Sequence, residues 1–281
     1  MTLTIKEITQ ISRPRFWIYL FGPFLIGAVA SISQLHDFSD WRLLLWGLYF
    51  LLPANLLVYG VNDIFDWETD SRNAKKTDYE KLLHPKNHKQ LALHIFLLNI
   101  PVLALFFVTP KNAVIAFCAF LFFSVFYSAK PIRAKSIPFL DSAFNILYIF
   151  PGIIGFYLAG GSHINTEIIL AGALWTAAMH AYSAVPDIAA DKSVGVRTIA
   201  TFAGFKRTLW ICEVLYMSAA VITFSYLPRT AIVLGAVYSL MIAVSFSKTT
   251  NLELMKVYRF FPIVNAGCGM LVFFSIALKL I

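Results

Sequence analysis

The chain has 281 residues, of which 59% are hydrophobic and 16% aromatic, whereas only 14% are charged. With a mean hydropathy of +0.72, it carries more apolar surface than one soluble domain can bury, which excludes an ordinary water-soluble protein. In a soluble protein the net charge of +8 would suggest nucleic acid. Here the Lys and Arg residues lie in short segments between apolar stretches, so we expect membrane lipids and no nucleic acid as partners.

Nine apolar stretches follow one another along the chain, each close to the roughly 20 residues that a spanning helix needs. They are predicted at about 15–33, 41–62, 91–108, 111–128, 137–159, 165–186, 207–226, 230–247 and 258–280. The sequence therefore predicts an all-α, multi-pass membrane bundle of about nine transmembrane helices around a central cavity. We expect residues 1–281 to form a single domain.

The basic residues are distributed very unevenly between the two sides of this predicted bundle. Of the 23 Lys and Arg residues, only Arg42, Lys111, Arg229 and Lys279 fall on the side away from the N-terminus. Because short cytoplasmic segments carry the excess of Lys and Arg, the N-terminal side is predicted to be cytoplasmic. We therefore expect the protein in the cytoplasmic membrane.

Two groups of acidic residues fall on that cytoplasmic side, at the ends of the second and sixth predicted helices. In a helix, positions four apart share a face, so Asn62, Asp66 and Asp70 are predicted to form one polar column and Asp187 and Asp191 another. Stacked carboxylates repel each other and need a compensating cation. Clustered oxygen donors without Cys favour Mg²⁺ over zinc.

Basic side chains stand beside both acidic groups. They are Arg13, Arg15, Lys130, Arg133, Lys135, Lys192 and Arg197. Together with metal-bound carboxylates, they would form a pocket for a polyanion such as diphosphate, and the adjoining spans would hold an apolar chain. This combination suits the ionisation of an isoprenoid diphosphate: the cations stabilise the departing diphosphate, and aromatic faces stabilise the carbocation.

Four further polar residues lie inside the predicted spans. Asp141 and Asn145, four apart near the start of the fifth span, are functional candidates because ionisable residues in spans are rare. His180 and Asn55 each precede an acidic motif by seven residues. They are interpreted either as polar residues satisfied within the bundle or as contacts to substrate.

The spacing Asn62-Asp63-x-x-Asp66-x-x-x-Asp70 followed by Asp187-x-x-x-Asp191 resembles the paired signature of the UbiA superfamily of intramembrane prenyltransferases. Arg13-Pro14 before the first span and Tyr127-Ser128-x-Lys130 after the fourth extend the resemblance over the whole chain. It implies that Asp66, Asp70, Asp187 and Asp191 are catalytic, that these four and Asn62 bind diphosphate-bound Mg²⁺, and that Asp63 shapes the site. By the same resemblance, Lys130, Arg133, Lys192 and Arg197 contact the diphosphate or order the loops over it, and Arg13 is a further candidate to bind the diphosphate.

This chain departs from many members of the superfamily in two places. It has Ala190 where many have Gly, and its first acidic loop reads Lys75-Lys76-Thr77-Asp78-Tyr79 and then Leu82-Leu83-His84-Pro85. Several stretches instead resemble the carotenoid-modifying branch, the lycopene elongases: Val61 to Lys76, Asp141-Ser142 with Asn145, and Met179 to Asp187. The resemblance implies a polyene acceptor such as lycopene and a five-carbon donor, with Asn55, Tyr127, Asp141, Asn145 and His180 as candidates for the acceptor cavity.

Two alternatives remain open at this stage. Within the same enzyme class, the chain would prenylate an aromatic or quinone precursor or an ether lipid. In a different class, it would be a cation transporter whose acidic columns form an ion path. A transporter calls for ionisable residues near the middle of the bilayer and for broken helices, whereas the acids here gather at one face.

Overall fold

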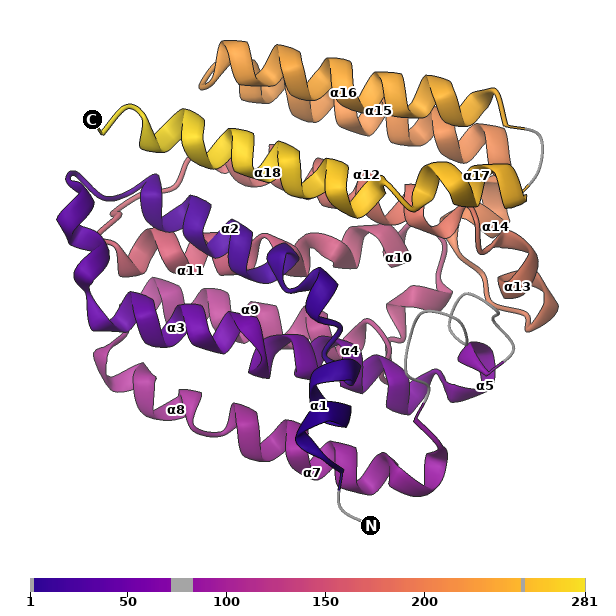
Figure 1. Cartoon of the computed structure of the whole chain (residues 1–281), viewed down its shortest axis with the longest axis horizontal. Helices are drawn as coiled ribbons and strands as arrows, with labels where there is room; N and C mark the ends of the chain where they lie inside the picture. The colour runs from indigo at the N-terminus through magenta and orange to yellow at the C-terminus, as the bar shows by residue number, and fades with distance from the viewer. Residues whose placement is uncertain (1–2, 72–82, 249–250, 281) are drawn as a thin grey trace. The chain divides into compact units, whose positions relative to one another are not determined.

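The computed structural model describes residues 3–71, 83–248 and 251–280 (Figure 1). Within these ranges every regular element is a helix and no strand occurs, which confirms the all-α prediction. The stretch from Lys75 to Leu82, which distinguishes the first acidic loop, lies outside the described residues.

Each of the nine predicted spans contains helix, but not all of them are single long helices. In the described ranges, six helical segments are long and apolar enough to cross a membrane: Trp41–Phe65, Pro85–Val108, Leu140–Leu158, Phe205–Phe224, Pro228–Phe246 and Glu253–Ala277. Pro14–Val29 and Lys111–Phe126 are shorter apolar helices. The membrane bundle is confirmed, whereas the count of nine spans is not.

The chain divides into two compact units, which are described separately. The first unit is drawn from residues 1–133, 150–162 and 280, and the second from residues 134–149 and 163–279. Helices of the first unit are α1 (Ile5–Ile11), α2 (Ile18–Val29), α3 (Trp41–Leu51), α4 (Pro53–Phe65), α5 (Trp67–Asp70), α7 (His88–Asn99), α8 (Val102–Leu105), α9 (Lys111–Phe126) and α11 (Phe150–Leu158). Helices of the second are α10 (Leu140–Ala143), α12 (Thr166–Ala184), α13 (Ile188–Ser193), α14 (Ile199–Ala203), α15 (Phe205–Phe224), α16 (Pro228–Phe246), α17 (Asn251–Tyr258) and α18 (Phe261–Ala277). Short 3-10 turns join several of them: Pro14–Phe16, Leu35–Ser39, Pro85–Asn87, Phe106–Val108, Ala134–Ser136 and Phe144–Tyr148.

In the first unit, glycines let α2 and α11 approach closely. A Cβ atom on Gly27 would lie 1.8 Å from the backbone oxygen of Gly152, and one on Gly155 would lie 2.2 Å from that of Phe24. In a lipid environment helix association depends on such close packing, since no hydrophobic effect drives apolar helices together. The glycines therefore fix the contact between these two helices.

The second predicted span of the first unit is interrupted between α3 and α4. Pro53 has no N–H with which to continue the ladder, so carbonyl groups of the preceding turn need other donors. The fully buried Asn55 amide supplies them, donating to the carbonyls of Phe50 at 2.8 Å and Leu51 at 2.6 Å. This places Asn55 in a structural role at the kink, and its predicted contact with the acceptor stays a prediction.

In the second unit, α12 packs against α10, α14, α15 and the turn Phe144–Tyr148, while α15 and α16 form a hairpin (Figure 1). A buried polar cluster joins its helices: Trp175 donates to the Tyr238 hydroxyl at 2.8 Å, and that hydroxyl donates to Asn265 at 2.9 Å. Burying these polar groups is tolerable because they bond to one another. α12 thus forms the centre of this unit and carries the chain to the second acidic motif.

Candidate functional site

The first acidic motif lies where α4 passes into α5. Asp66 leaves the helical conformation, with φ −113° and ψ 10°. The i to i+4 backbone bonds nevertheless continue through it, from Asp66 N–H to the Asn62 oxygen at 2.9 Å and from Asp70 N–H to the Asp66 oxygen at 2.8 Å. Asn62 donates from Nδ2 to Asp66 Oδ2 at 2.7 Å. These bonds agree with the predicted polar column.

The Asp66 carboxylate is fully buried and bonded to residues that follow α9. Ser128 donates from Oγ to Asp66 Oδ2 at 3.0 Å, and it accepts from Asn62 Nδ2 at 3.1 Å, which closes a triangle of three side chains. Arg133 Nη2 lies 3.5 Å from Asp66 Oδ1. A buried carboxylate requires such hydrogen bonds and charge compensation, so these contacts hold Asp66 in one orientation.

Arg13 lies on the neighbouring acid of the same motif. Its Nη2 atom is 2.7 Å from Asp63 Oδ1, and its guanidinium stands 4.7 Å from the centre of the Tyr59 ring. Both charged side chains are largely buried, with 10% and 4% exposed. The pair joins the segment before α2 to α4 and gives Arg13 a carboxylate partner, while the expected role of Asp63 in shaping the site stays a prediction.

The second acidic motif does not continue the long helix before it. α12 ends at Ala184, because Pro186 has no N–H to extend it, and Asp187 instead occupies the N-cap position of the short helix α13. The expectation that this motif closes the sixth span is therefore wrong in detail. Asp191 N–H still bonds the Asp187 oxygen at 2.9 Å, so these two acids stand one helical turn apart as predicted.

The predicted cations differ in exposure. Arg133 is half-buried against Asp66, whereas Lys130, Lys192 and Arg197 are exposed. Lys192 follows Asp191 directly, and Arg197 stands just before the Thr198 cap of α14. Tyr127 caps the C-terminal end of α9, immediately before Ser128. Exposed Lys and Arg beside acidic motifs fit a site that receives a charged ligand from water.

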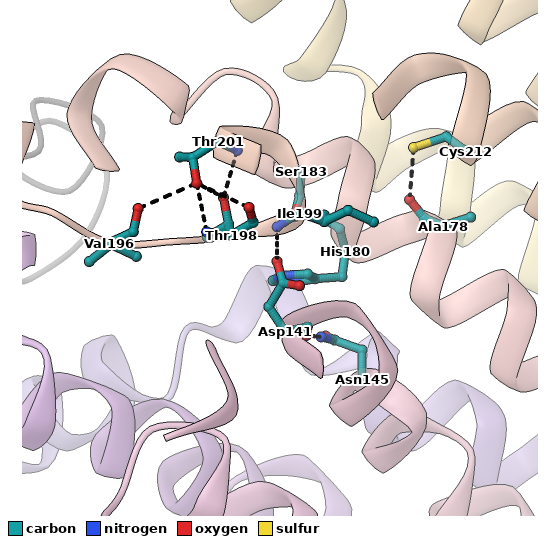
Figure 2. A network of polar contacts seen from close by, with 10 residues as sticks. All are labelled: Asp141, Asn145, Ala178, His180, Ser183, Val196, Thr198, Ile199, Thr201 and Cys212. Carbon is teal, nitrogen blue, oxygen red and sulfur yellow. Dashed lines mark hydrogen bonds and ion pairs between the residues drawn. The ribbon is translucent and has the colours of Figure 1, made fainter. Parts of the chain in front are cut away.

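In the second unit, Asp141 and His180 come together (Figure 2). Asp141 Oδ2 lies 3.5 Å from His180 Nε2 and accepts from the Ile199 N–H at 2.9 Å. Asn145 donates to the backbone oxygen of Asp141 at 2.8 Å, so its amide steadies the helix rather than the carboxylate. Three of the predicted acceptor candidates are therefore neighbours.

The comparisons with known proteins agree with this architecture. The model of the UbiA prenyltransferase family matches residues 20–276. The chain belongs to the UbiA prenyltransferase family. As a member it is an integral membrane enzyme that transfers prenyl groups, which confirms the expected fold and activity and sets aside the cation transporter.

Two curated relatives of this UbiA protein are lycopene elongase/hydratases. The one from Haloferax volcanii is 36% identical over 94% of this chain and 86% of its own length, and the one from Haloarcula japonica is 36% identical over 96% and 90%. A solved UbiA homologue from Archaeoglobus fulgidus, bound to DMAPP and Mg²⁺, aligns over 97% of this chain and 99% of its own with a TM-score of 0.70. At 17% identity that structure supports the fold alone.

The donor atoms of this UbiA protein are of the kind that Mg²⁺ prefers. Within residues 3–71, 83–248 and 251–280, no three or more His, Cys, Asp or Glu side chains gather into a cluster that could hold a metal ion unaided. Mg²⁺ is commonly held by one or two carboxylates together with substrate phosphates. Two motifs that each offer a pair of carboxylates fit that way of binding.

Two members of these networks were not predicted from sequence. Ser128 was noted only within a motif, yet it bonds both Asn62 and Asp66, and the Ile199 N–H bonds Asp141. Its place as a polar residue at the end of the fourth predicted span was a signal for Ser128. No signal in the sequence indicates the backbone donor at Ile199.

Proposed function

We propose that this enzyme transfers a five-carbon prenyl group from its diphosphate to the end of a long polyene such as lycopene. The observation that carries the proposal is the 36% identity to a lycopene elongase/hydratase over 94% of the chain. A terminal double bond of a polyene is itself a carbon nucleophile. It therefore needs no base to activate it, in contrast with a phenol or an alcohol.

The metal in this proposal is Mg²⁺, held through Asn62, Asp66, Asp70, Asp187 and Asp191 with the diphosphate oxygens. When bound, Mg²⁺ stabilises the negative charge that develops on the departing diphosphate. The fit rests on the donor set, which consists of carboxylates and one amide, and on the buried orientation of Asp66.

The protein's own cations share the work of binding the donor. Lys130, Lys192 and Arg197 contact the diphosphate from exposed positions. Arg133, whose Nη2 lies 3.5 Å from Asp66 Oδ1, contacts it from beside the first acidic motif. Arg13 contributes by fixing Asp63. Aromatic side chains, of which the chain has 26 Phe and 12 Tyr, surround the prenyl cation and exclude the water that would consume it.

The acceptor enters the apolar interior, where the candidates to line its path are Asn55, Tyr127, Asp141, Asn145 and His180.

The enzyme lies in the cytoplasmic membrane, and both of its acidic motifs face the cytoplasm. The support for this orientation is the crowding of Lys and Arg on the side of the N-terminus.

Expression in a lycopene-producing bacterium tests the proposal. The expected products are carotenoids heavier by one or two five-carbon units, with or without added water, as measured by mass spectrometry. An Asp191→Asn variant serves as the inactive control. If lycopene stays unmodified while membranes of the same cells prenylate 4-hydroxybenzoate, a naphthoate or a glyceryl ether phosphate, the acceptor assignment fails.

A further inference from the structure

His180 lies in the second unit beside a carboxylate that is entirely buried. Its Nε2 atom is 3.5 Å from Asp141 Oδ2, with 14% of the His180 side chain and none of the Asp141 side chain exposed (Figure 2). An isolated buried carboxylate is costly, so a partner that can carry positive charge stabilises it. The pair therefore brings an imidazole, which is able to accept a proton, beside a buried acid.

The carboxylate is also held from a second direction. The same Oδ2 atom accepts from the Ile199 N–H at 2.9 Å, where the chain enters α14. Thr198 and Thr201 fix this entry, because the Thr198 N–H donates to Thr201 Oγ1 at 2.8 Å and the Thr201 N–H donates to Thr198 Oγ1 at 3.1 Å. Asp141 is therefore oriented by a rigid backbone donor and presents a fixed oxygen to His180.

The position of this oxygen orients the imidazole ring. The Nε2 edge of His180 faces Asp141 Oδ2 at 3.5 Å. Imidazole is the side chain that enzymes use most often as a general base. The arrangement is that of a base oriented by a neighbouring acid.

His180 also lies on the helix that leads to the second acidic motif. It stands about one turn before the end of α12 at Ala184, which is about 6 Å at a rise of about 1.5 Å per residue. The chain then leaves the helix and reaches Asp187, at the N-cap position of α13. Both His180 and the motif proposed to hold diphosphate therefore belong to one short stretch of the second unit.

We infer that His180, held by Asp141, is the base that takes up the proton released when prenyl transfer ends. This inference rests on the proposed function. The carbon–oxygen bond of the donor breaks and diphosphate leaves with the electron pair. The acceptor double bond then forms the new carbon–carbon bond, which leaves a tertiary cation on the acceptor.

The cation is discharged in one of two balanced ways, each of which releases one proton. A neighbouring C–H bond supplies its electron pair to a new double bond, or a water molecule adds and becomes a hydroxyl group. In both cases the proton passes to the imidazole ring of His180. Two relatives of this chain are named lycopene elongase/hydratases, so both endings are chemically relevant.

Purified wild-type enzyme and His180→Gln are compared with dimethylallyl diphosphate, lycopene and Mg²⁺. Gln keeps an N–H donor for Asp141 but accepts no proton at neutral pH. We expect kcat to fall by about 100-fold or more, with the KM for dimethylallyl diphosphate within about twofold of wild type. The ratio of hydrated to dehydrated product should change as well. His163→Gln, an exposed His before α12, is the matched control and should behave as wild type.

Chemical rescue separates a base from a structural residue. In His180→Ala, added imidazole should restore a substantial fraction of kcat, whereas it should not accelerate Asp66→Asn. Asp141→Asn should lower kcat by about tenfold, since it keeps an acceptor for the Ile199 N–H but loses the charge. Thermal unfolding of each variant in detergent reports whether it is folded.

Three outcomes overturn the inference. One is a His180→Gln enzyme with wild-type kcat and product ratio, the second is a loss in His180→Ala that imidazole does not restore, and the third is a raised KM for the diphosphate with unchanged kcat. The proposed function fails separately, when wild-type enzyme converts no polyene. In that case the same variants are tested on whichever acceptor the wild type prenylates.

Discussion

Asn62 donates from its amide nitrogen to the Asp66 carboxylate across 2.7 Å, and Ser128 completes the contact from the end of α9. The triangle explains why the first acidic motif contains an amide next to its acids. A carboxylate at position 62 would lie within hydrogen-bond distance of Asp66 and repel it, whereas the amide donates to Asp66 and orients it.

Replacing Asp66 or Asp191 with Asn is expected to lower prenyl transfer by at least about 100-fold. Each change removes a negatively charged oxygen from a proposed metal ligand, at a cost of several kcal/mol of charge stabilisation, while side-chain volume is kept. The measurement is the turnover of labelled dimethylallyl diphosphate by purified protein. Glu68→Gln, at an exposed position on α5, is the matched control and should retain activity. Near-normal turnover of either Asn variant would remove that residue from the metal site.

Lys130→Ala and Arg197→Ala are expected to raise the KM for the prenyl diphosphate more than that for the acceptor. A charge-assisted bond to a phosphate oxygen contributes about 1.5–3 kcal/mol, which corresponds to roughly 10- to 150-fold. Steady-state kinetics with each substrate varied in turn would measure the change in KM for the diphosphate and the change in KM for the acceptor. Lys111→Ala, an exposed Lys at the start of α9, provides the comparison. An unchanged KM in both test variants would mean that these cations set topology only.

Gly155→Ala is expected to destabilise the first unit by about 1–3 kcal/mol. The added Cβ would stand 2.2 Å from the Phe24 oxygen and 3.1 Å from the Ala28 nitrogen, both of which are backbone atoms that cannot rotate away. Thermal unfolding in detergent would show the loss. A Cβ atom added at Gly267 on α18 would meet no atom within 4 Å, so Gly267→Ala should leave the midpoint temperature of unfolding unchanged or slightly raised. Equal midpoints for the two variants would contradict the close approach of α2 and α11.

The helices and the acidic motifs could be predicted from the sequence because both depend on local patterns. Apolar length gives a helix in lipid, and a spacing of four residues places Asn62 beside Asp66. Ends and interruptions were harder to predict. Pro53 and Pro186 can be read from the sequence. Whether a proline kinks a helix or ends it depends, however, on hydrogen-bond donors such as the Asn55 amide, which only the fold brings to the free carbonyl groups.

Contacts between residues far apart in sequence were the part that could not be predicted. Arg13 was expected at the diphosphate, and the structure shows its guanidinium bonded to Asp63. Asp141 was recognised as an unusual acid in a span, but its bond to the Ile199 N–H depends on how α10 and α14 pack. A single sequence carries residue types and local spacing, whereas such pairs are determined by tertiary structure.

Removal of divalent metal is expected to abolish both transfer and donor binding. The proposed ligands are carboxylate and amide oxygens that bind diphosphate through Mg²⁺, so a chelated enzyme should present repelling negative charges to its substrate. Two measurements check this: turnover in excess chelator, and the rise in unfolding temperature that dimethylallyl diphosphate produces. A ligand at 100 times its Kd stabilises a protein by about 2.7 kcal/mol, so the rise should be clear with Mg²⁺ and absent without it. In the wild type, Mg²⁺ added back should restore both the turnover and the rise in unfolding temperature. In Asp191→Asn it should restore neither. Full turnover in excess chelator, or a rise in unfolding temperature that does not depend on metal, would show that the Lys and Arg side chains bind the donor without Mg²⁺.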